Sequence, residues 1–202
     1  MKIFDLIFYI NKFHCGDDVD LSFLSPIMTR KFSKLDKVAL SAMFKCYVKN
    51  TNPSLVFGSM HGQFGRLAKL TEQFKQENEV SPIGFSASVH NNTIGVFSLI
   101  NKINAPYTAI SAGENTLSNT LCEGFALLKE TKEVLLCCAD SFEGKDYAIS
   151  ALISKKSSEG AIKVRMTNSK KEVEQDEYQS FARFLMSDEK YFYGNFFRLE
   201  KV

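Results

Sequence analysis

The chain has 202 residues, of which 45% are hydrophobic and 24% are charged, and its formal net charge is +2. This composition is that of an ordinary globular protein, and the length is sufficient to bury a sizeable core without disulfides or structural metals. The nearly balanced charge excludes a whole-protein attraction to nucleic acid, so a charged partner has to be met by a local patch. We therefore expect a single domain, residues 1–202, that does not bind nucleic acid.

The cysteines and the N-terminus bear on the cellular compartment. The five cysteines are irregularly spaced and placed largely in apolar segments, as in proteins that keep their thiols reduced. Lys2 precedes the apolar run IFDLIFYI, but Asp5 interrupts this run and no small-residue cleavage site follows it. No stretch approaches the ~18 apolar residues of a membrane span. The expectation is a cytoplasmic protein without a membrane span.

Neither a metal nor an organic cofactor is expected. His14, Cys15 and Asp17 lie close together, but they lack a second pair of ligands at the spacing of a metal site. The segment GSMHGQFG (58–65) has neither the lysine of a phosphate-binding loop nor the glycine spacing of a dinucleotide site. The sequence therefore predicts a protein that works without cofactors.

Strands and helices alternate through the first 140 residues. The apolar run at 3–13 predicts a strand, for which an edge position is possible, and residues 24–32 predict a loop. A helix is expected from Ser33 to Lys49, with Ser33 as its N-cap and Asp36 completing a weaker form of the capping box. One face of this helix is apolar, and the neighbouring face carries four lysines: Lys34, Lys37, Lys45 and Lys49.

The alternation continues up to Asp140 and is typical of a layered α/β fold. The expected elements are a buried strand at 54–59, a helix at about Leu67–Gln76, an extended segment from 83 that becomes helical near Asn91, a strand at 107–111, a helix after Gly113 and a strand covered on both faces at 133–140. Beyond them, DYAISALIS and AIKVRM are predicted to pair as a β-hairpin. An amphipathic helix is expected at 170–187, and we expect the aromatic tail after it to pack on the rest. The buried side of this helix should carry Tyr178, Phe181, Phe184 and Leu185.

The corner between the strand at 107–111 and the next helix is the first candidate site. Many acyl-transfer enzymes place a nucleophile at such a corner, because the helix N-terminus stabilises negative charge on sulfur or oxygen. Here the position holds Gly113, which also suits a sharp turn by its backbone freedom. Glu114 follows in the first helical turn, where the helix dipole alone favours an acidic residue. The corner therefore lacks its expected nucleophile.

Three segments resemble the N-terminal half of a β-ketoacyl synthase, a condensing enzyme of the thiolase fold. They are FSKLDKVALSAMF (32–44), SPIGFSASVHNNTIGVFSLI (81–100) and the run from YTAISAGE to LLCCAD (107–140). The chain is more similar still to truncated ketosynthase-like N-terminal domain proteins of aryl polyene pigment biosynthesis. The resemblance is good over 26–141 and loose over 142–202. It implies a thiolase-like α/β half-fold on a mixed sheet, with an added C-terminal β-hairpin and helix.

By this resemblance the chain is expected to lack the usual condensing chemistry. Gly113 replaces the nucleophilic cysteine, and Cys122 lies about 13 Å further along the helix at 1.5 Å per residue. The two histidines that act on malonyl thioesters belong to a second half of the family's fold. The resemblance thus implies a chain-length-factor-like subunit that forms a heterodimer with a full-length ketosynthase and shapes its acyl channel. The residues it assigns to the partner and the channel are Gly84, Phe85, Ser88, His90 and Asn91.

A basic patch is the second candidate site. Six basic residues and only one acid lie between Pro26 and Asn50, and an acidic acyl carrier protein would be steered to such a surface. A solvated helix face explains the same charges equally well. The candidate docking residues are Arg30, Lys31, Lys34, Lys37 and Lys45.

Two other functions stay open. The chain could be a stand-alone acyl transferase or malonyl decarboxylase that uses Ser88 or Ser111 as nucleophile with His90 as base. Ser88 and His90 are two residues apart, and such residues on an extended segment point the same way. No acidic partner for His90 is identifiable, so a structural or pocket-lining role for this histidine competes with the catalytic one. His61, beside a glycine in a turn, is interpreted as a hydrogen-bonding loop residue. A half-fold with a binding role unrelated to lipids is the third hypothesis.

Overall fold

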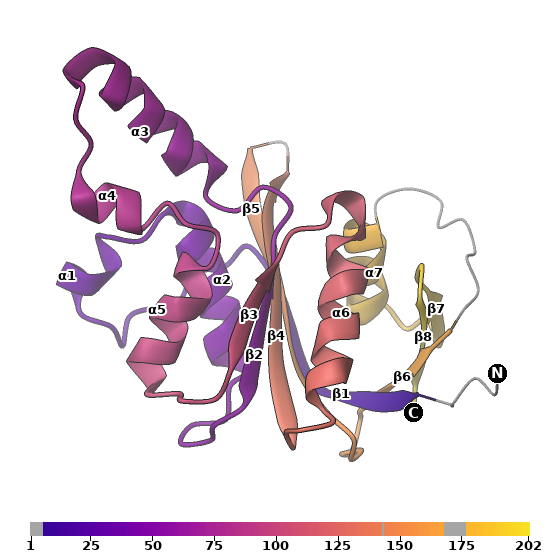
Figure 1. Cartoon of the computed structure of the whole chain (residues 1–202). Helices are drawn as coiled ribbons and strands as arrows, with labels where there is room; N and C mark the ends of the chain where they lie inside the picture. The colour runs from indigo at the N-terminus through magenta and orange to yellow at the C-terminus, as the bar shows by residue number, and fades with distance from the viewer. Residues whose placement is uncertain (1–5, 143, 168–176) are drawn as a thin grey trace.

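The computed structural model describes residues 6–142, 144–167 and 177–202 and shows one eight-stranded mixed sheet (Figure 1). The strand order is β3-β2-β4-β5-β1-β6-β8-β7. The strands are β1 Ile7–Gly16, β2 Ser54–Gly58, β3 Tyr107–Ile110, β4 Glu133–Phe142, β5 Lys145–Ser154, β6 Ile162–Met166, β7 Tyr191–Tyr193 and β8 Phe197–Lys201. Strands β3, β2 and β4 are parallel, whereas the five others pair antiparallel.

Helices cover both faces of this sheet (Figure 1). They are α1 Pro26–Thr29, α2 Lys34–Cys46, α3 Phe64–Glu77, α4 Pro82–Ser86, α5 Asn92–Asn101, the 3-10 turn η1 Gly113–Asn115, α6 Thr116–Leu127 and α7 Glu177–Met186. Helices α2 and α5 pack on one face, and α6 and α7 on the other. Each face has its own apolar core, so β2 and β4 are buried on both sides. The sequence predicted a buried strand for β2 and a strand covered on both faces for β4.

Helices α3 and α4 project away from the sheet as an arm (Figure 1). Within α3 only Leu70 is buried, and α4 has no buried residue. Helix α3 ends at Glu77, and Asn78 caps it in a left-handed conformation. Because so few side chains of α3 and α4 are buried, the packing of the arm against the body is confined to its base.

Two predictions of strand pairing were wrong. The first strand does not lie at an edge, because β1 pairs with β5 on one side and with β6 on the other. The segments β5 and β6 consequently do not form a hairpin with each other. The hairpin is formed by β4 and β5, whose register runs from Glu133 opposite Ser154 to Phe142 opposite Lys145.

Three local predictions also need correction. Residues 82–86 are helical and not extended, because the Ser81 hydroxyl accepts from the Gly84 N–H and Pro82 occupies the first helical position. Helix α2 ends at Cys46, since Tyr47 is extended, so Lys49 lies outside it. The predicted loop at 24–32 contains the short helix α1.

The segment after 142 belongs to the same sheet. Strands β5, β6, β8 and β7 extend it beyond the parallel part, and α7 packs on their inner face with Tyr178, Phe181, Phe184 and Leu185 buried, as predicted. The helix predicted for 170–176 lies outside the described residues. The aromatic tail is the β7–β8 hairpin, whose Phe192 and Phe197 rings contact Phe181.

Candidate functional site

The strand-to-helix corner has the geometry of a nucleophile turn without a side chain on it. Gly113 adopts φ +58°, the left-handed region, and a β-carbon at this position would meet no described atom within 4 Å. The Thr116 hydroxyl fixes the turn, because it accepts from the Ala112 N–H at 3.0 Å and donates to the Gly113 carbonyl at 2.7 Å. Glu114 is exposed in this turn. The corner thus offers room for a side chain, and only its backbone conformation requires glycine.

Gly113→Ala is expected to lower the free energy of unfolding by about 1–2 kcal/mol, the cost of a left-handed conformation for a residue with a β-carbon. Gly65→Ala is the matched control, because Gly65 also has nothing within 4 Å but lies in helix α3 with an ordinary φ. The control should leave stability unchanged or raise it by about 0.5–1 kcal/mol. Urea unfolding measures both, and equal effects of the two changes would contradict a strained corner.

The proposed pairs of Ser88 or Ser111 with His90 do not form. The segment before α5 is a set of turns, so Ser88 and His90 do not share one side of an extended strand. The Ser88 hydroxyl donates to the Phe85 carbonyl at 2.7 Å, and the Ser111 hydroxyl donates to the Met60 carbonyl at 3.0 Å. Each serine hydroxyl therefore donates to a backbone carbonyl and not to the His90 ring.

His90 holds the segment before α5 against the end of β2. Its Nε2 donates to the Ser59 carbonyl at 2.9 Å, and its ring lies 5.8 Å from the Phe57 ring. A β-carbon at Gly62, where φ is +52°, would lie only 2.7 Å from the His90 ring. The His90 ring thus fills the space over the Gly62 turn. This is a structural role, the alternative to the catalytic role considered from the sequence.

Sequence reasoning missed the buried carboxylate of Asp140, at the end of β4. One oxygen, Oδ1, accepts from the Ser59 hydroxyl at 2.9 Å and the His61 N–H at 3.0 Å, and Oδ2 accepts from the Met60 N–H at 2.8 Å. The His61 ring lies 3.5 Å from the same carboxylate. The Ser59 hydroxyl is buried and also accepts from the Gly62 N–H, so all its bonds serve the turn. This cluster organises the 59–62 turn, and the apolar run ending in Asp140 was its only sequence signal.

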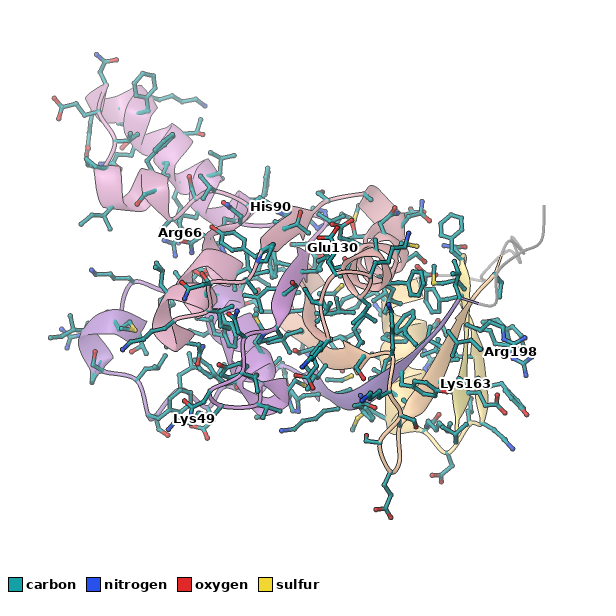
Figure 2. All side chains as sticks on the ribbon, turned by 60° about the horizontal axis from the view of Figure 1, so that its bottom comes forward. Lys49, Arg66, His90, Glu130, Lys163 and Arg198 are labelled. Carbon is teal, nitrogen blue, oxygen red and sulfur yellow. The ribbon has the colours of Figure 1, made fainter. Side chains whose placement is uncertain are left out.

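Asp36 joins three helices at the base of the arm. Its carboxylate is fully buried. Oδ1 accepts from Gln63, Asn92 and Thr93 at 2.8, 3.2 and 2.7 Å, and Oδ2 accepts from the Ser33 N–H and hydroxyl at 2.8 and 2.9 Å and from Arg66 at 3.3 Å. The capping box was predicted, but the links to α3 and α5 were not. Figure 2 shows Arg66 and His90 at the base of the arm, where these contacts lie.

No described thiol replaces the missing nucleophile. All five cysteines are free. Burial raises the pKa of Cys138 and of Cys15 to about 12, and it raises the pKa of the half-buried Cys122 as well. These thiols stay protonated near neutral pH, and a protonated thiol is a poor nucleophile. Among the described residues, no cluster of three or more His, Cys, Asp or Glu side chains could hold a metal ion.

The predicted carrier-docking residues divide into two groups. Arg30, Lys31 and Lys34 are exposed near the start of α2, whereas Lys37 is half-buried. Lys45 is paired with Asp18, whose carboxylate also lies 2.9 Å from the His14 ring. The available positive charge is therefore concentrated at 30–34.

Exposed apolar side chains gather on the arm and on α5. On the arm they are Phe64, Leu67, Phe74, Ile83 and Phe85. On α5, Leu99 has 80% of its side chain exposed, next to the edge strand β3. An edge strand has backbone groups free to pair with another strand, and contiguous exposed apolar surface marks interaction sites.

The layered mixed sheet and its strand-to-helix corner define the class as a thiolase-like ketosynthase half-fold. The sequence matches the family model described as "Beta-ketoacyl synthase, N-terminal domain" over residues 12–189. Because this match spans most of the chain, the protein belongs to that family. Comparison with curated proteins gave no match. In the described part of the chain, no helix combines the length and apolar character needed to span a bilayer.

Several solved structures share this fold. A chain of the ketosynthase (ApeO) in complex with its chain length factor (ApeC) from Xenorhabdus doucetiae matches with a TM-score of 0.73 and 16% identity, covering 94% of this chain and 96% of that one. The ishigamide ketosynthase/chain length factor matches with a TM-score of 0.58 and 15% identity, over 67% of this chain and 47% of that one. A beta-ketoacyl synthase from Burkholderia phymatum STM815 gives 0.53 and 9%, over 65% and 44%. This chain spans less than half the length of the last two chains. The family match and the first structural match confirm the predicted thiolase-like α/β fold class.

Proposed function

We propose that this protein is a non-catalytic, chain-length-factor-like subunit that forms a heterodimer with a full-length ketosynthase and shapes its acyl channel. The observation that carries the proposal is the corner at Gly113, which keeps the backbone of a nucleophile turn and has open space for a side chain but holds none. A subunit that only supports a partner's chemistry needs no nucleophilic cysteine at this position. The system we assign is of type II polyketide or fatty-acid type and makes aryl polyenes.

The surface around β3 supports a protein partner. Strand β3 is an edge of the sheet, and Leu99 and the apolar side chains of the arm are exposed. Two of the similar structures are described as ketosynthase–chain length factor pairs. We call β3, α5 and the arm the partner face. Docking here would extend the sheet across the interface by strand addition and bury the apolar arm against the second subunit.

Of the residues assigned to the acyl channel, Phe85 is the one best placed to contact another chain. It is 60% exposed on α4. Ser88 and His90 make the local contacts described above, so their proposed role is to hold the segment that presents Gly84, Phe85 and Asn91. The proposed docking site for an acidic acyl carrier protein is centred on Arg30, Lys31 and Lys34, with Lys37 at its margin.

Co-expression with a ketosynthase of the same genome is the test of this function. A complex of one copy of each chain should elute as a single peak in size-exclusion chromatography. Incubated alone with malonyl carrier protein, this chain should show no added mass by intact mass spectrometry and release no carbon dioxide. A stable acyl adduct on the chain, or condensation product made without the partner, would refute the proposal.

A further inference from the structure

A groove lies between helix α7 and the first residues of β5. On α7 its described lining residues are Gln179, Ala182, Arg183 and Met186. These positions recur at helical spacing, so they share one face of the helix. Lys145 and Tyr147, which line the groove from β5, are two residues apart and point to the same side of the sheet. The groove has a volume of about 440 Å³, within the ~300–1,000 Å³ that is typical of small-molecule sites.

The walls of the groove are largely apolar and aromatic. The rings of Tyr147 and Tyr178 pack edge to face, with their centres 6.0 Å apart. The Tyr178 hydroxyl donates to the Cys138 carbonyl at 3.0 Å and lies 3.1 Å from the Tyr147 carbonyl, so this ring is held in place. Ala182 is small and buried, which leaves room beside the rings. An alkyl chain that enters the groove would therefore cover apolar surface that is now open to water.

Two cations accompany these walls, Lys145 on β5 and Arg183 on α7. Both are exposed, and neither has an ion-pair partner within 4 Å among the residues that the structure describes. The described residues that line the groove include no acidic side chain. The guanidinium of Arg183 is a planar fork, which can hold a carboxylate by two parallel hydrogen bonds. The groove thus combines apolar walls with positive charge that no described carboxylate neutralises.

We propose that this groove binds a free medium-chain carboxylic acid. Its carboxylate pairs with Arg183 and Lys145, and its alkyl chain lies against the two tyrosine rings and Ala182. An ester or thioester of the same acid has no charge to offer these cations. A protein is a poorer match, because a protein interface involves about 20–30 residues on each side, many more than line this groove. The site goes beyond the proposed function and is separate from the partner face, since α7 packs on the opposite face of the sheet from α5 (Figure 1).

Titration of the whole chain with sodium octanoate, followed by amide NMR at constant ionic strength, tests the site. Saturable shifts are expected in α7 and at the start of β5. Arg183→Gln and Lys145→Gln should each weaken octanoate binding about tenfold, because each removes a charge-assisted contact. Lys49→Gln is the matched control, because Lys49 is also exposed but does not line the groove, and it should change nothing.

Two further ligands separate recognition of the carboxylate from recognition of the chain. Octanol has the same chain without the charge and should bind at least tenfold more weakly than octanoate. Hexanoate should bind about 15-fold more weakly, because each of the two methylenes it lacks changes the affinity about fourfold when buried. Unsaturable shifts spread over the chain, unchanged binding in both glutamine variants, or equal affinity for octanol or for hexanoate would each overturn the proposal. Amide spectra of the variants establish that they remain folded.

Discussion

Asp36→Ala is expected to lower the free energy of unfolding by about 3–5 kcal/mol, a large part of the ~5–15 kcal/mol that stabilises a typical domain. The change removes the acceptor for six donor contacts and leaves several of those groups buried without a partner. It also releases the N-terminus of α2 from α3 and α5. Urea unfolding followed by circular dichroism measures the loss.

Two comparisons separate this effect from the loss of any carboxylate. Asp36→Asn keeps the shape of the side chain but replaces one acceptor oxygen by an NH₂ group, so it should also be clearly destabilising. Asp18→Ala removes an exposed carboxylate that pairs with Lys45 and His14, and surface pairs of this kind contribute about 0–1 kcal/mol. If Asp36→Ala cost no more than Asp18→Ala, Asp36 would not be what joins the three helices.

The local parts of the fold could be predicted because their signals lie close together in the sequence. The cap of α2 needs only Ser33 and Asp36, three residues apart, and both were identified. The buried strands β2 and β4 are continuous apolar runs, and that pattern predicted that β2 is buried and that β4 is covered on both faces. The same carboxylate of Asp36 also binds Gln63 and Thr93, 27 and 57 residues away, and no local pattern indicates such contacts.

Strand pairing was predicted less well, for a physical reason. Strands β5 and β6 are separated by a short polar connection, which suggested a hairpin. In the structure β1 lies between them, so that its apolar Phe8 and Ile10 are covered by α7 and neighbouring strands. The alternation along a strand specifies which residues face inward but not which strand lies beside it. The long-range position of β1 was therefore beyond a local argument.

In the candidate site, too, features with a local sequence signal were predicted and features that depend on long-range contacts were not. Gly113 was found from the strand, turn and helix around it, and its left-handed conformation agrees with that prediction. The proposed pairing of Ser88 with His90 assumed an extended backbone, and the proline helix cap at Ser81 together with the turns before α5 invalidated it. Asp140 was overlooked because its partners Ser59 and His61 are about 80 residues away.

Leu99→Asp is expected to weaken the complex with the ketosynthase about 100-fold or more, while leaving the isolated chain as stable as before. Leu99 is 80% exposed on α5 beside the edge strand β3, so the folded chain alone loses little when it is replaced. In the proposed complex the carboxylate would be buried in an apolar interface without a partner. A 100-fold loss corresponds to about 2.8 kcal/mol, because each 1.4 kcal/mol is a tenfold change in Kd, and hot-spot residues at the centre of an interface contribute about 2–4 kcal/mol.

Met186→Asp is the matched control for this change. Met186 is likewise an exposed apolar residue on a helix, with 70% exposure, but it lies on α7, which packs on the opposite face of the sheet from α5. Titration calorimetry of both variants against the ketosynthase gives the two Kd values, and urea unfolding of each chain alone gives the stability control. Wild-type affinity in Leu99→Asp, or an equal loss in Met186→Asp, would place the partner elsewhere than on β3, α5 and the arm.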